Sequence, residues 1–96
     1  SWKGGSIYYY GPNWKQQARA ARRRDDHCCQ LCGVSQKKLR RALDVHHLQP
    51  FREFGYKPGI NDYYRVANEL TNLISLCTKC HKRVEIGAAV IQPYLL

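Results

Sequence analysis

Two Cys-x-x-Cys pairs lie on either side of a His-His dipeptide, and a further histidine directly follows the second pair. The first pair is Cys29 and Cys32, and the second is Cys77 and Cys80. Four thiolates are the closed ligand set of a structural zinc ion, whereas a catalytic ion keeps an open coordination position. Histidines that remain outside a four-cysteine site are free to hold such a second ion. The spacing therefore predicts two metal chemistries in one small chain.

The cysteine count argues against a disulfide framework. The chain has five cysteines, and four of them fall into the two pairs, a pattern typical of a zinc site. Two redox dithiols are the alternative, but a redox protein would carry a single exposed pair in a βαβ context. Cys28 is left over, and we expect it to be a small, half-buried side chain. Zinc-bound thiolates predict a reducing, intracellular compartment.

The histidines have the chemistry that phosphodiester cleavage requires. His46 and His47 are adjacent in the sequence, and His81 directly follows Cys80. Imidazole is a good metal ligand and, near neutral pH, a good general base. Hydrolysis of a phosphodiester needs a base that activates water and a cation that stabilises the phosphate and the leaving oxygen. Lone histidines are usually structural, so the grouping of these three is what favours catalysis.

The charge of the chain predicts a polyanionic partner. Sixteen basic residues stand against seven acidic ones, for a net charge of +9. Such an excess most often indicates nucleic acid, although solvated helix faces are the simpler alternative. The basic residues cluster in three segments, and the candidates for phosphate contacts are Arg22, Arg23, Lys37, Lys38, Arg40, Lys82 and Arg83.

The N-terminal part predicts one long helix before the first cysteine pair. Residues 6–10 are aromatic and prone to form a strand. Pro12 or Asn13 can open a helix that extends from Trp14 to about Arg24, with an apolar stripe at helical spacing. After the cysteine pair, residues 35–41 predict a short basic helix or turn.

The C-terminal part predicts strand, loop, strand and helix. Residues 42–47 and 73–76 have the composition of strands. Residues 49–71 contain several Pro and Gly and are expected to be mainly loop, with one helical piece near 63–70. Thr78 can cap a last helix that extends to about Ile86 and ends at Gly87.

Two segments together resemble an HNH endonuclease of the branch that carries zinc. These segments are Leu43-Asp44-Val45-His46-His47-Leu48-Gln49-Pro50 and Asn72-Leu73-Ile74-Ser75-Leu76-Cys77-Thr78-Lys79-Cys80-His81. The resemblance covers residues 27–86 and implies a small α+β fold with a ββα-metal core. It also implies that His47 is the general base, that His46 and His81 hold one divalent cation, and that Asn72 ties down the loop that orients the base.

The resemblance leaves the details of the second metal site open. The family often has Asp where this chain has His46, and imidazole favours manganese, nickel or zinc over magnesium. We expect Mg²⁺ or Mn²⁺, with Ni²⁺ or Zn²⁺ as alternatives. Glu85 lies one helical turn after His81 and is either a third ligand or a surface carboxylate. Asp44 shares a strand face with His46 and is expected at the surface or beside the ligands.

We therefore predict one domain over residues 1–96, with an N-terminal aromatic strand and basic helix (1–26) and a zinc-clamped HNH core (27–86). Its predicted function is metal-dependent hydrolysis of DNA, by nicking or by double-strand cleavage. The alternative is a catalytically silent zinc module that binds nucleic acid or protein. No apolar segment approaches the length of a membrane span. The start without Met and the apolar end predict a domain excised from a longer protein, although removal of an initiator Met also explains the start.

Overall fold

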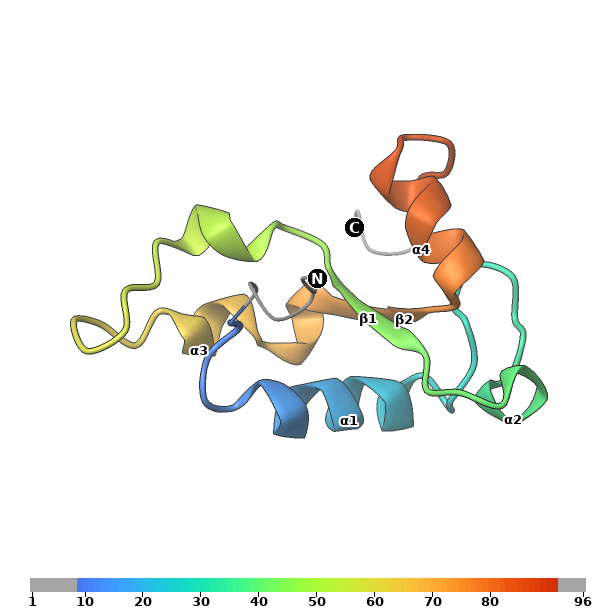
Figure 1. Ribbon diagram of the computed structural model, residues 1–96, viewed down its shortest axis with the longest axis horizontal. Helices are drawn as coiled ribbons and strands as arrows, with labels where there is room; N and C mark the ends of the chain where they lie inside the picture. Colours follow the sequence, from blue (N-terminus) through green and yellow to red (C-terminus); the bar gives the residue numbers. More distant parts are fainter. Residues whose placement is uncertain (1–8, 92–96) are drawn as a thin grey trace, which may run out of the picture.

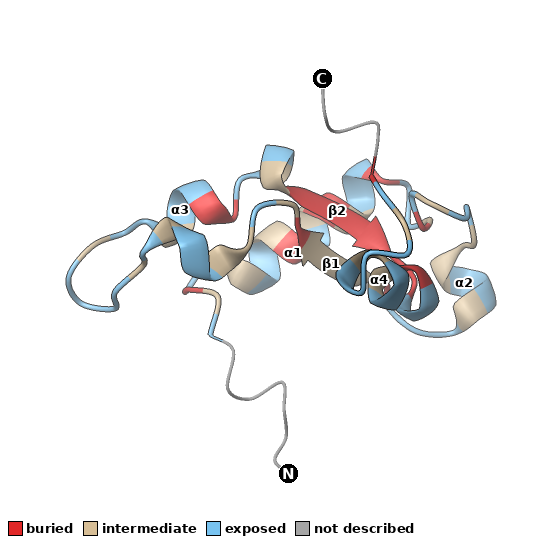
Figure 2. Cartoon of the chain, turned by 90° about the horizontal axis from the view of Figure 1, so that it is seen from above, coloured by how far each residue is buried: buried red, intermediate tan, exposed pale blue. Residues whose placement is uncertain are grey.

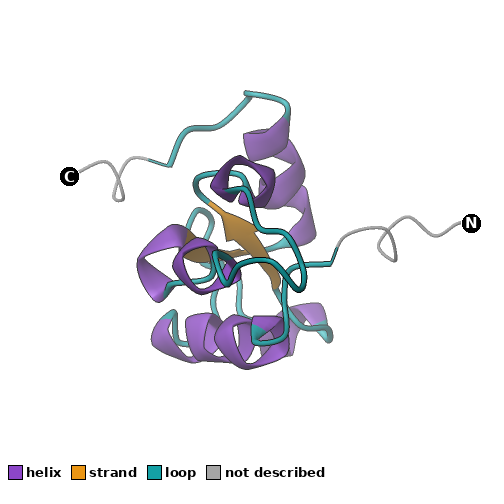
Figure 3. Ribbon diagram, turned by 90° about the vertical axis from the view of Figure 1, so that its left-hand side faces the viewer, coloured by secondary structure: helices purple, strands orange, loops and turns teal. Residues whose placement is uncertain are grey.

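A two-stranded antiparallel sheet forms the centre of the computed structural model, which describes residues 9–91. Strand β1 (Asp44–His47) pairs with β2 (Leu73–Leu76), so that Asp44 is opposite Leu76 and His47 is opposite Leu73. Helix α1 (Trp14–Arg24) lies on one side of the strands and α4 (Thr78–Glu85) on the other (Figures 1 and 3). The small α+β architecture with two antiparallel strands is therefore confirmed. The predicted aromatic stretch 6–10 lies largely outside the described residues.

The two strands differ in burial, as Figure 2 shows. Every residue of β2 is buried, whereas β1 is half-buried except for its last residue, His47. The hydrophobic core contains Leu43, Ile74 and Leu76 together with three of the cysteines. A core of this size is thin, which is why a small domain of this kind needs a metal or another cross-link.

Helix α1 has the predicted bounds, and its small residues face the sheet. Ala18 and Ala21 are buried, and they allow the helix backbone to approach β2 closely. Asn13 occupies the N-cap position, but its side chain forms no capping hydrogen bond. Instead, Asn13 Oδ1 accepts a hydrogen bond from Asn68 Nδ2 at 2.9 Å. The predicted cap residue therefore serves a tertiary contact rather than the helix end.

Strand β1 begins two residues later than predicted, because β2 ends opposite Asp44. The residue after Leu76 is already the N-cap of α4, so nothing remains for Ala42 or Leu43 to pair with. Leu43 instead receives a hydrogen bond from Arg22 Nε on its carbonyl oxygen and donates its N–H to Gln36 Oε1. Before this strand, α2 (Gln36–Leu39) is the predicted short basic helix.

The segment between the strands is mainly loop, as predicted, but its helical part is divided. It contains the 3₁₀ turns η2 (Phe51–Phe54) and η3 (Leu70–Asn72), and the single-turn helix α3 (Tyr64–Ala67). The prediction of one helical piece over 63–70 is therefore wrong. The helix ends because Asn68 is its C-cap and Glu69 adopts an extended backbone.

The prediction that Thr78 caps the last helix is also wrong. Thr78 is the first helical residue, and Cys77 is the N-cap, with its Sγ accepting a hydrogen bond from the Cys80 N–H at 3.4 Å. Sulfur replaces the usual hydroxyl because the Cys-x-x-Cys turn and the helix start coincide. Gly87 follows the helix with a positive φ of 80°, as expected of a glycine that ends a helix.

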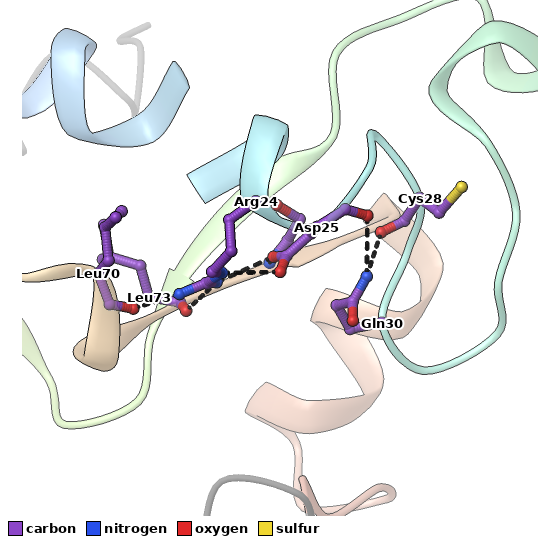
Figure 4. A network of polar contacts seen from close by, with 7 residues as sticks. Arg24, Asp25, Cys28, Gln30, Leu70 and Leu73 are labelled. Atoms are coloured by element: carbon purple, nitrogen blue, oxygen red, sulfur yellow. Dashed lines mark hydrogen bonds and ion pairs between the residues drawn. The ribbon is translucent and has the colours of Figure 1, made fainter. Parts of the chain in front are cut away.

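A polar network attaches the end of α1 to β2, as Figure 4 shows. The Arg24 guanidinium donates to both carboxylate oxygens of Asp25, at 2.8 and 3.0 Å, and to the carbonyls of Leu70 and Leu73. Asp25 in turn accepts the N–H of Ser75 at 2.9 Å. Burial opposes ionisation of Asp25, but these hydrogen bonds outweigh it and lower its pKa. The network holds the chain in place directly before the first cysteine pair.

Candidate metal centres and active site

The four paired cysteines come together in one cluster. The sulfur atoms of Cys29, Cys32, Cys77 and Cys80 all lie within 4.8 Å of one another. One pair comes from the turn after α1, and the other comes from the junction of β2 and α4. Gly33 has a positive φ of 83°, which turns the chain back after the first pair. Cys28 is outside the cluster and half-buried, and its backbone forms an isolated bridge with Ser35.

The electrostatics of this cluster fit a divalent cation. Burial opposes ionisation of Cys29, but hydrogen bonds led by the backbone N–H of Cys32 outweigh it and lower its pKa to about 6. Burial and the neighbouring sulfurs raise the pKa of Cys80. Four thiolates at this separation repel one another, so a bound cation would be needed for all of them to ionise. The donor set is compatible with a structural zinc site.

A second group of possible metal ligands lies between β1 and α4. One donor atom from each of His46, His81 and Glu85 lies within 4.8 Å of the other two. The rings of His46 and His81 are in edge contact, with their centroids 5.0 Å apart. Glu85 Oε2 is 3.3 Å from His81 Nε2, one turn along the same helix. The structure thus brings together the two predicted ligands and the candidate third one.

Asp44 orients His81 from the strand. Its Oδ2 is 3.0 Å from His81 Nδ1, and its Oδ1 is 3.3 Å from the exposed guanidinium of Arg41. Because Asp44 engages Nδ1, the Nε2 atom of His81 is left to face Glu85. Burial, together with the nearby His81, lowers the pKa of His46. A neutral imidazole is the form that binds a metal, so the lowered pKa of His46 suits this role.

His47 is not part of this group of ligands. It is the residue after His46 in a strand, and successive side chains of a strand face opposite sides. His47 accordingly faces α1, where its ring stacks on Trp14 at a centroid distance of 4.9 Å and is only 7% exposed. Its Nε2 lies 2.8 Å from Asn68 Oδ1. Burial lowers the pKa of His47, and the hydrogen bond with Asn68 partly offsets this.

One open pocket is nevertheless lined both by the ligand group and by His47. It has a volume of about 670 Å³, and it is lined by His46, His47, His81 and Glu85 as well as by aromatic side chains that include Tyr10 and Phe51. The pocket reaches both faces of β1 because His47 is the last residue of the strand. A substrate in this pocket would therefore contact the ligand group and His47 together.

Asn72 fixes the chain that follows His47. Its Oδ1 accepts the N–H of Gln49 at 2.9 Å, while its Nδ2 donates to the carbonyls of Gln49 and Ala67. Its own carbonyl accepts the N–H of Leu48 at 2.8 Å. These contacts attach the loop after His47 to η3, and the role of Asn72 in orienting a base stays a prediction.

The predicted phosphate-binding residues are mostly exposed, with one exception. Arg22 is half-buried, and its Nε donates to the Leu43 carbonyl at 2.9 Å, so this side chain also supports the start of β1. The exposed candidates lie on or next to α1, α2 and α4, and they are Arg23, Lys37, Lys38, Arg40, Lys82 and Arg83.

The contacts that surround His47 were not predicted from the sequence. Asn68 lies 21 residues after it, in a segment without a recognisable motif. Trp14 was predicted only as part of the apolar stripe of a helix, and Tyr10 only as part of an aromatic stretch. Their contact with His47 depends on how α1 docks on the sheet, which no local pattern encodes.

No helix among residues 9–91 has the length and the apolar composition that a membrane span requires.

Comparison with known proteins assigns the chain to a family. No curated protein and no solved structure matches this chain. A family model described as HNH endonuclease matches residues 29–85, which is more than half of the chain. The match includes both cysteine pairs, the His-His dipeptide, Asn72 and the three-residue ligand group. The chain therefore belongs to the HNH endonuclease family.

Proposed function

We propose that this chain is a metal-dependent endonuclease domain that hydrolyses DNA phosphodiester bonds. The observation that carries the proposal is the pocket in which His46, His81 and Glu85 gather beside His47. Two imidazoles and a carboxylate within 4.8 Å of one another are a suitable ligand set for one divalent ion. The family membership of the chain supports nuclease chemistry at this pocket.

The chain would hold the cation through His46 and His81, with Glu85 as the third ligand. Mg²⁺ and Mn²⁺ are the candidates that suit DNA hydrolysis, and the two imidazoles also suit Ni²⁺ or Zn²⁺. When bound, the cation supplies positive charge that stabilises the phosphate and the leaving oxygen. Asp44 holds the His81 ring so that Nε2 is available, a common arrangement beside metal-bound histidines.

His47 would take the proton from the attacking water. A ring with a lowered pKa is neutral near pH 7, which is the form that accepts a proton. Asn72 keeps the following loop in place, so that the position of His47 at the end of β1 is fixed. The pocket reaches this end of the strand, which allows a substrate phosphate to approach both His47 and the ligand group.

The four cysteines would hold a structural zinc ion that ties the first cysteine turn to α4. Zinc-bound thiolates need a reducing environment, so we place the protein inside the cell. The exposed basic residues on α1, α2 and α4 would contact DNA phosphates without reading the base sequence.

The test compares three histidine variants on supercoiled plasmid, with manganese as the titrated metal. His47→Ala should retain zinc and DNA affinity but lose about 10²–10⁴-fold in rate, the usual value of a positioned base. His46→Ala and His81→Ala should bind the catalytic metal more weakly, so that excess manganese partly restores cleavage. His27→Ala, an exposed histidine outside the pocket, is the matched control.

The rival function is a silent zinc module that binds DNA without cutting it. Wild-type protein that binds plasmid but leaves it intact with every divalent metal would establish this rival. Cleavage by His47→Ala at the wild-type rate would reject His47 as the base. Loss of cleavage on addition of a chelator, with recovery on addition of Mn²⁺, is the result that we expect.

A further inference from the structure

The immediate surroundings of His47 come in part from outside the segment that matches the family. Trp14 stacks on the ring at an interplanar angle of 21°, and Tyr10 packs against it at a centroid distance of 4.8 Å. Both residues precede position 29, where the family match begins. Phe51 packs against a further side of the His47 ring, with the two ring centroids 5.4 Å apart. The N-terminal segment therefore contributes to the site and does not merely cover the sheet.

Asn68 supplies the polar contact of this histidine. Its Oδ1 lies 2.8 Å from His47 Nε2, and Asn68 is completely buried. The amide Nδ2 donates to the Tyr10 carbonyl at 2.6 Å and to Asn13 Oδ1 at 2.9 Å. The Tyr10 carbonyl can only accept, so the Asn68 amide group cannot be turned around without losing this hydrogen bond. The oxygen of Asn68 must therefore be the atom that faces His47.

This arrangement determines where the proton of a neutral His47 ring resides. An amide oxygen can only accept, so His47 Nε2 must carry the hydrogen and donate it. The other ring nitrogen, Nδ1, has no hydrogen-bond partner among residues 9–91 and keeps its lone pair. A partner that fixes one ring nitrogen of a histidine selects the tautomer and the ring orientation.

We infer that Asn68 is the positioning residue for His47, and that it holds the ring with Nε2 protonated and Nδ1 left as the atom that accepts a proton. Tyr10 and Asn13 act through Asn68 by fixing its amide group. The active site thus extends into residues 10–14, beyond the part of the chain that the family model matches. The catalytic part of this inference rests on the proposed function, whereas the placement of the proton does not.

The first measurement is independent of cleavage. Full-length chain labelled with ¹⁵N in its histidines and loaded with one equivalent of Zn²⁺ is studied by long-range ¹H–¹⁵N correlation, which distinguishes the two neutral tautomers. The signals of His47 are identified by their loss in His47→Ala. We expect a single tautomer with the hydrogen on Nε2. A hydrogen on Nδ1 in the wild-type chain would overturn the inference without any further variant.

The second measurement uses variants of Asn68. Asn68→Ala removes the acceptor, so we expect a mixture of tautomers and a fall in kcat of roughly 10- to 100-fold at unchanged KM, comparable to the loss of other orienting partners. Asn68→Asp keeps an acceptor oxygen toward His47 and should retain the hydrogen on Nε2. Its negative charge raises the pKa of His47, so its rate is compared with that of the wild type at a pH where both rings are neutral. The second oxygen of the introduced carboxylate would face the Tyr10 carbonyl and lower stability. If Asn68→Ala does not fold, the wild-type spectrum and Asn68→Asp still decide the question.

Gln17→Ala is the matched control. Gln17 Nε2 donates to the backbone carbonyl of Asn68 at 2.8 Å, so its loss affects the same residue but not the amide group. We expect Gln17→Ala to lower stability and leave the His47 tautomer and kcat unchanged. Asn68→Ala that cleaves at the wild-type rate with a single Nε2 tautomer would refute the role of Asn68. A wild-type chain with the expected tautomer but no cleavage would instead refute the proposed function.

Discussion

Replacing Asp44 by alanine should weaken binding of the catalytic metal without removing the chemistry. Asp44 Oδ2 lies 3.0 Å from His81 Nδ1 and holds the ring that presents Nε2 toward Glu85. Loss of a partner of this kind typically costs 10- to 100-fold in metal affinity. The side chains of Asp44 and His81 are 26% and 23% exposed, so water screens their interaction in part. We therefore expect the lower end of that range, about tenfold, or about 1.4 kcal/mol.

The other contact of Asp44 should add little to this effect. Arg41 approaches Asp44 at 3.3 Å, but its side chain is 58% exposed. Ion pairs of that kind are worth about 0–1 kcal/mol, so their loss is too small to unfold the chain. The expected result is an intact protein with an altered metal requirement.

The assay is cleavage of supercoiled plasmid at increasing Mn²⁺. The half-saturating concentration of Mn²⁺ should rise about tenfold in Asp44→Ala, whereas the rate at saturating Mn²⁺ should stay close to that of the wild type. Asp62→Ala removes the carboxylate of a comparable exposed pair, with Arg65 at 3.3 Å, and should change neither quantity. An unchanged half-saturating concentration in Asp44→Ala would refute the orienting role. A rate that stays low at saturating Mn²⁺ would show that Asp44 acts in the reaction itself.

Three further predictions concern the zinc site, the network at the end of α1 and DNA binding. Cys77→Ser should unfold the chain or collapse its yield, because structural zinc supplies folding free energy on the order of 10 kcal/mol, whereas Cys28→Ser should be tolerated. Zinc content and thermal melting measure both effects, and equal damage in the two variants would contradict the ligand assignment. Asp25→Asn should lower the free energy of unfolding by about 1.5–3 kcal/mol, because Asp25 is buried beside Arg24, whereas Asp62→Asn should have almost no effect. The lowered pKa of Asp25 means that this contribution is present above pH ~4 and disappears as the pH falls through its folded-state pKa, so the two chains should converge in acid. Lys38→Ala should reduce the slope of log affinity against log salt by about one unit, and DNA binding that does not respond to salt would contradict an electrostatic interface.

The elements with strong local signals were predictable from the sequence. Helix α1 and strand β2 have the expected bounds, because an apolar stripe at helical spacing and a run of four apolar or small residues each specify one structure. The cysteine cluster was predictable for a similar reason, since two Cys-x-x-Cys turns have few other uses in so short a chain. Each Cys-x-x-Cys pair is local, and the joining of the two pairs was predictable because four thiolates complete one zinc site.

The errors arose where a tertiary contact competes with a local preference. Thr78 is an ordinary helix cap, but the cysteine turn places the sulfur of Cys77 at that position instead. The helical segment after residue 63 breaks at Asn68, whose side chain bonds to Tyr10, Asn13 and His47. Partners that are 21 to 58 residues away in the sequence cannot be recognised from a window around Asn68.

The geometry of β1 explains why the site needs helices on both faces of the sheet. Two adjacent residues of a strand point in opposite directions, so His46 and His47 cannot both face α4. His46 meets its partners on α4, while His47 must be held by α1 and by the loop that contains Asn68. The two histidines share a pocket only because the strand ends at His47. The proposed roles of the His-His dipeptide therefore require a short β1, with the candidate metal ligands of α4 on one face and α1 against His47 on the other.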